Sequence, residues 1–64
     1  MNAYDQARTE EETTFRSYAA AAVAHREDNP MSVVRLRQAR SRWLAAQERL
    51  HRAEARETAR LVRR

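Results

Sequence analysis

The second half of the chain repeats its residue types at intervals of seven positions. Arginine recurs as Arg35, Arg42, Arg49, Arg56 and Arg63. The first three arginines are each followed by a large apolar residue: Leu36, Trp43 and Leu50. An alanine stands three positions after each of these apolar residues: Ala39, Ala46 and Ala53. A seven-residue apolar repeat is typical of a helix that packs lengthwise on another helix, because two turns of a slightly underwound helix take about seven residues. The repeat therefore predicts helix–helix packing, with a basic flank beside the apolar seam.

Composition narrows the fold class. A chain of 64 residues forms at most one domain, and small chains bury so little surface that they usually need a partner, a metal or a covalent link. Cysteine is absent, which excludes disulfides and thiolate metal sites. Alanine is by far the commonest apolar residue and isoleucine is absent, and this favours helix over strand. We therefore expect an all-α protein.

Several function classes are disfavoured by what the sequence lacks. Glycine is absent, which argues against phosphate-binding loops and strained nucleophile turns, and no Ser–His–Asp order is present. Two helices also cannot enclose a pocket of ordinary ligand size, so we expect a non-enzymatic protein without a cofactor. No targeting signal is visible, and the longest apolar run, residues 19–24, is too short to span a bilayer. We therefore expect a cytoplasmic protein with no membrane partner.

Local signals predict two helices and one corner in a single helical-hairpin domain, residues 1–64. Asn2 is a suitable N-cap for a helix over residues 3–27, although Thr9 with Glu12 would also allow a start near residue 10. Residues 28–30 form the corner, because Asn29 before Pro30 is disfavoured in a helical conformation. A second helix is predicted over residues 31–62.

The short corner predicts that the helices are antiparallel neighbours. The numbers of opposed residues should then sum to about 58, which sets Phe15 against Trp43 and Ala22 against Leu36. Tyr4, Ala7, Phe15, Tyr18 and Ala22 would form the apolar face of the first helix. Alanines in the facing seam would let the two helix axes approach closely.

The charges are divided between the halves. Residues 1–28 hold six acidic residues and three arginines, whereas residues 29–64 hold ten arginines and three glutamates. In the expected register, residues 10–12 lie near Arg49, and Asp5 lies near Arg52 and Arg56. The halves can neutralise each other within one chain or between copies, or the surplus can bind an anion. A GC-rich genome also favours arginine over lysine, so the all-arginine composition alone does not indicate a function.

The second helix carries more apolar surface than one neighbour can cover. Val33, Leu44 and Val62 lie roughly 90–120° around the helix from the main seam. A homodimer that forms a four-helix bundle would cover both stripes, so we expect a self-associating protein–protein interaction module. The candidate interface residues are Phe15, Leu36, Trp43, Leu44, Leu50 and Leu61.

A di-iron-like metal-binding bundle is a weaker hypothesis. Glu11 falls on the apolar face of the first helix, where it could pair with an arginine or bind a metal. Glu48 and His51 form an E-x-x-H motif, and in the expected register Glu48 lies at the same level of the hairpin as Glu11. A glutamate on one helix beside E-x-x-H on the next is the pattern of di-iron bundles. Arginines flank this motif and it lies away from the seam, so no metal site is expected.

The C-terminal residues are the candidates for anion binding. Residues past about 57 should extend beyond the first helix, so Arg60, Arg63 and Arg64 would lack an acidic neighbour in their own chain. Binding of nucleic acid or another polyanion through the arginine-rich second helix is therefore an alternative function, although no known nucleic-acid-binding motif is present. Leu61 offers this overhang a different use, an apolar contact with a second protein.

Overall fold

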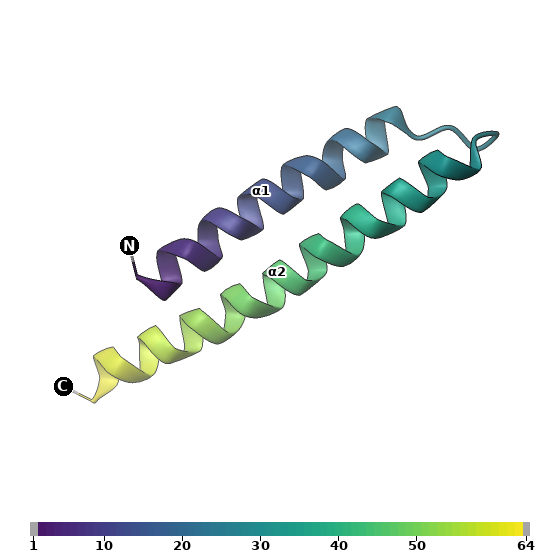
Figure 1. The fold of residues 1–64 in the computed structure, drawn as a ribbon. Helices are drawn as coiled ribbons and strands as arrows, with labels where there is room; N and C mark the ends of the chain where they lie inside the picture. The colour runs from purple at the N-terminus through teal and green to yellow at the C-terminus, as the bar shows by residue number, and fades with distance from the viewer. Residues whose placement is uncertain (1, 64) are drawn as a thin grey trace.

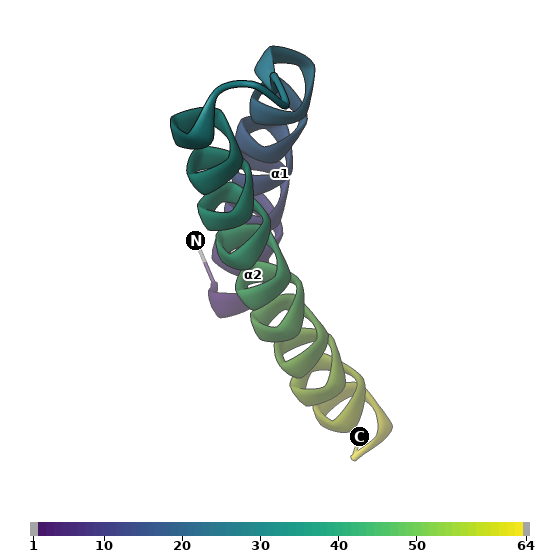
Figure 2. The ribbon, with the colours of Figure 1, turned by 90° about the vertical axis from the view of Figure 1, so that its right-hand side faces the viewer.

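The computed structural model describes residues 2–63, which form two α-helices, α1 (Ala3–Ala24) and α2 (Pro30–Val62). The helices lie side by side and antiparallel, joined by one corner (Figure 1). The described residues contain no strand, which confirms the predicted all-α hairpin. In Figure 2, α2 continues well past the start of α1, which confirms the predicted C-terminal overhang. Neither helix is both long and apolar enough, within residues 2–63, to cross a bilayer.

The first helix begins as predicted and ends earlier than predicted. Asn2 Oδ1 accepts a hydrogen bond from the backbone N–H of Asp5 at 2.8 Å, so the ordered helix starts at Ala3 and not near residue 10. It ends at Ala24 instead of residue 27, because His25 adopts an extended conformation with φ −66° and ψ 134°. The predicted boundary was therefore wrong by most of a helical turn.

Ser32 explains this early end. Its Oγ accepts from the N–H of Arg26 at 3.0 Å and lies 2.8 Å from the carbonyl oxygen of Arg26. The Ser32 hydroxyl thus bonds to both the backbone N–H and the backbone carbonyl of Arg26. The Arg26 N–H is available to it because this N–H no longer takes part in the hydrogen bonding of α1. The second helix starts at Pro30, within one residue of the predicted start, and Asn29 Oδ1 caps it by accepting from the N–H of Met31 at 3.0 Å.

The two helices meet along a seam in which both follow a seven-residue repeat. Every seam residue is buried or half-buried: Tyr4, Ala7, Glu11, Thr14, Tyr18 and Ala21 in α1, then its C-cap His25, and Ser32, Leu36, Ala39, Trp43, Ala46, Leu50, Ala53 and Glu57 in α2. The prediction for α1 was wrong at two positions, since Phe15 and Ala22 are exposed and Thr14 and Ala21 take their places. Thr14 can occupy the seam because its hydroxyl donates to the carbonyl oxygen of Glu10 at 2.8 Å.

The buried part of the hairpin consists of alanine. Among the described residues only Ala7, Ala39, Ala46 and Ala53 are classed as buried, and Ala46 is 0% exposed. The molecule is a rod with extents of 56 × 16 × 12 Å and a radius of gyration of 15.3 Å. A compact chain of this length would have a radius of gyration of about 11 Å. The hairpin is thus held by a narrow alanine seam and encloses no large apolar side chain among residues 2–63.

Candidate interaction surfaces

Trp43 occupies a seam position of α2 and contacts three side chains of α1. Its ring stacks on Tyr18 with centroids 5.3 Å apart and an interplanar angle of 11°. The Phe15 ring lies 5.3 Å from it at 57°. Both geometries are favourable for aromatic pairs. The Phe15–Trp43 contact confirms the predicted register.

In the described part of the chain, Glu11 is bound by Trp43 and not by an arginine, which was the predicted partner. The indole Nε1–H of Trp43 donates to Glu11 Oε1 at 3.0 Å, whereas no arginine lies within ion-pair distance of this carboxylate among residues 2–63. The carboxylate therefore satisfies the one polar atom of the tryptophan ring, which a half-buried indole requires. The sequence offered no signal for this pairing, because indole and carboxylate are not an obvious charge pair.

We expect Glu11→Ala to lower the free energy of unfolding by about 1–2 kcal/mol, because it leaves the indole N–H without its charged acceptor. Glu11→Gln is the matched control, since its amide oxygen can still accept the bond, and it should lose less than half as much. Urea unfolding followed by circular dichroism measures both. Equal losses for the two variants would show that the negative charge, and not the hydrogen bond, stabilises the contact.

The weak metal candidates are not brought together. Glu48 forms an ion pair with Arg52 at 3.0 Å, and both side chains are largely exposed. His51 is also exposed, and Glu11 is engaged by Trp43. No group of three His, Cys, Asp or Glu side chains in the described part of the chain could hold a metal ion.

The six candidate interface residues fall into two sets. Leu36, Trp43 and Leu50 are half-buried and belong to the seam within the hairpin. Phe15, Leu44 and Leu61 are 46%, 45% and 55% exposed. Phe15 touches Trp43, and Leu44 follows Trp43 about 100° further around α2. We call Phe15, Trp43 and Leu44 the apolar patch; it lies near the middle of the rod.

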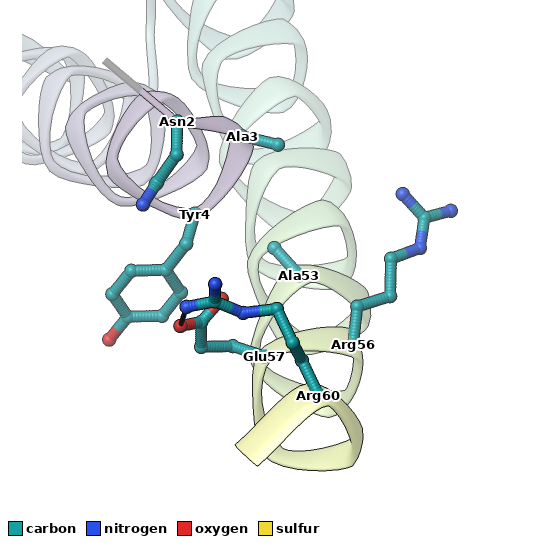
Figure 3. Close-up of a pocket in the computed structure, with 7 residues that line it drawn as sticks. All are labelled: Asn2, Ala3, Tyr4, Ala53, Arg56, Glu57 and Arg60. Atoms are coloured by element: carbon teal, nitrogen blue, oxygen red, sulfur yellow. Dashed lines mark hydrogen bonds and ion pairs between the residues drawn. The ribbon is translucent and has the colours of Figure 1, made fainter. Parts of the chain in front are cut away.

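The anion-binding candidates at the C-terminus differ from expectation. Arg60 has an acidic neighbour in its own chain, because its guanidinium donates to Glu57 (Figure 3). Glu57 occupies the last position of the α2 seam, beside the N-cap Asn2 and the first α1 residues, Ala3 and Tyr4. Arg63 is the exposed C-cap of α2, and Arg64 lies outside the described residues. The prediction that Arg60 lacks a counter-charge was therefore wrong.

Arg49 and Arg52, which precede Arg60 in α2, pair with acidic residues of different helices. Arg49 forms an ion pair with Glu10 across the two helices, as predicted. Arg52 pairs with Glu48 of its own helix, and no ion pair joins Asp5 to Arg52 or Arg56. Arg52 pairs within α2 because Glu48 stands one turn away in the same helix, where a long side chain reaches it without bridging to α1.

Comparison of the chain with protein-family models, curated proteins and solved structures found no match. The surfaces of the hairpin are therefore the basis for inferring its function. They comprise the apolar patch, the mixed-charge C-terminal end and the arginine-rich flank of α2.

Proposed function

We propose that this protein is a helical-hairpin interaction module that self-associates, with two copies packing into a four-helix bundle. The observation that carries this proposal is the imbalance of burial: alanines are the only buried residues among those described, while Phe15 and Leu44 remain almost half exposed. A chain this small gains little stability from so thin a seam. A second copy would add the missing apolar contacts.

The position of the apolar patch supports a symmetric pairing. A two-fold axis through the patch would bring the same residues of both copies together, as in most homodimers. A stable interface needs about 800 Å² from each partner. This is about a seventh of the 5395 Å² accessible surface of the hairpin, and one face of a rod can supply it.

Analytical ultracentrifugation at micromolar concentration should give twice the 7.5 kDa mass of the chain. Leu44→Glu should shift the mass to that of one chain, because it places a charge in the apolar patch. Leu44 belongs to no seam position, so the hairpin itself should keep its helical signal.

Met31→Glu is the matched control for this experiment. Met31 is 57% exposed and stands four residues before Arg35, on the flank away from the patch. It should leave the dimer intact. A wild-type chain that sediments as a well-folded monomer would overturn the proposal, and dissociation by both variants would place the interface elsewhere.

A further inference from the structure

Four arginines line one flank of α2 beside the seam. Arg35, Arg42, Arg49 and Arg56, which we call the arginine row, stand seven residues apart, so they project to the same side of the helix. Successive members are about 10.5 Å apart along the axis, and the row extends for about 31 Å. The row is therefore a straight line of positive charge that follows the groove between the helices.

The groove beside the row is hollowed at two places. One hollow is lined from α2 by Arg49, Arg52, Ala53 and Arg56 and from α1 by Ala3, Gln6, Ala7 and Glu10. The other lies at the corner and is lined by Arg35 with Ala21, Ala24, Arg26, Asn29 and Ser32. The α1 wall of both hollows consists of small or uncharged side chains, with Glu10 as the exception. An extended anion could thus reach the guanidinium groups without meeting a row of carboxylates.

The row is poorly neutralised by the chain itself. Arg49 pairs with Glu10, but Arg35, Arg42 and Arg56 have no carboxylate within 4 Å among residues 2–63. By contrast, Arg60 of the predicted anion site is paired with Glu57. The row is thus an exposed line of positive charge in which, among residues 2–63, a carboxylate pairs with Arg49 alone.

We propose that the arginine row binds the phosphate backbone of duplex nucleic acid without reading its sequence. Guanidinium groups bind phosphates bidentately, and backbone contacts alone supply sequence-independent affinity. Single-strand binders also use aromatic side chains on which bases stack. Here the aromatic residues belong to the seam or the apolar patch, and Figure 3 shows Arg56 pointing away from Tyr4.

Duplex phosphate fits this flank better than an acidic protein does. Stable protein interfaces have an apolar, aromatic-rich centre surrounded by a polar rim. The hollows along the row offer alanine and polar side chains in place of such a centre. The row also lies on a different flank from the apolar patch, so this proposal does not depend on dimerisation.

Fluorescence anisotropy with a labelled DNA duplex, measured over a series of salt concentrations, tests the proposal. Affinity should fall steeply with salt. The double variant Arg42→Gln, Arg56→Gln should bind more weakly and should reduce the slope of log affinity against log salt by about 1.8, at roughly 0.9 for each lost phosphate contact. Both residues are exposed and unpaired in the described chain, so the fold should be unaffected.

Arg16→Gln, Arg37→Gln is the control with the same change in net charge. Arg37 stands two residues after Arg35, about 200° around α2, and Arg16 is exposed on α1. This variant should keep most of the wild-type slope. Equal effects of the two double variants would show a dependence on net charge only and would overturn the assignment to the row. Absence of duplex binding at low salt, or tighter binding of polyglutamate than of duplex, would also overturn it.

Discussion

Trp43→Ala is expected to lower the free energy of unfolding by about 3–5 kcal/mol, the range for removing a large aromatic side chain from a packed site. The substitution removes the stack on Tyr18, the tilted contact with Phe15 and the hydrogen bond to Glu11 together. These contacts join α1 to α2 near the middle of the rod, and the alanine seam offers nothing of comparable size to replace them. Chemical unfolding at a fixed protein concentration measures the loss, since self-association would make stability concentration-dependent.

Trp43→Phe separates the two kinds of contact that the tryptophan makes. Phenylalanine keeps an aromatic ring against Tyr18 but has no N–H for Glu11, so we expect it to cost about 1–2 kcal/mol. A loss below ~1 kcal/mol for Trp43→Ala would contradict the role of Trp43 as the anchor of the hairpin. It would also remove the physical basis of the apolar patch.

Ala46→Leu is expected to destabilise the hairpin by about 3 kcal/mol, at the upper end of the usual range for overpacking. Ala46 is 0% exposed and lies in the seam between Ala39 and Ala53, where a longer side chain has no space unless the helices separate. Separation would also weaken the Trp43 contacts on the neighbouring turn. Thermal unfolding by circular dichroism should show a lower midpoint with the helical signal retained at low temperature.

Ala55→Leu provides the comparison for that variant. Ala55 lies in the same helix but is exposed, and leucine is nearly as good a helix former as alanine. We expect a change within about 0.5 kcal/mol. If Ala46→Leu were tolerated as well as Ala55→Leu, close approach of the helices at the alanines would not be what holds the hairpin together.

The fold was largely predictable because its signals are local. Asn2 and Asn29 cap the helices, and Pro30 is compatible with the first turn of α2 but not with a continuous helix through the corner. The seven-residue repeat of α2 is visible without knowledge of its partner. A short corner then leaves little choice but an antiparallel neighbour, which is why the contact between Phe15 and Trp43 could be expected.

The details of the candidate surfaces were less predictable, because they depend on side chains from distant parts of the chain. Ser32 ends α1 early by bonding back to Arg26, and no residue near Ala24 signals this. Arg60 was expected to be unpaired because its neighbour in α1 was missing, yet Glu57 on the preceding turn of its own helix was within reach. Local and long-range partners compete for the same flexible arginines, and helix spacing alone does not decide between them.

The sequence by itself determined that this chain forms two helices, where they turn and which stripe of α2 is packed, since caps, proline and heptad spacing act through the local backbone. Only the tertiary structure decided the exact edge of the α1 face that meets that stripe. Glu11 and Thr14 are polar, and Thr14 reads as a surface residue, while Phe15 reads as core. The seam takes the two polar residues because Trp43 supplies a donor for Glu11 and the helix backbone satisfies Thr14. Phe15 is thereby left on the outside, where it forms the patch that we propose a second copy covers.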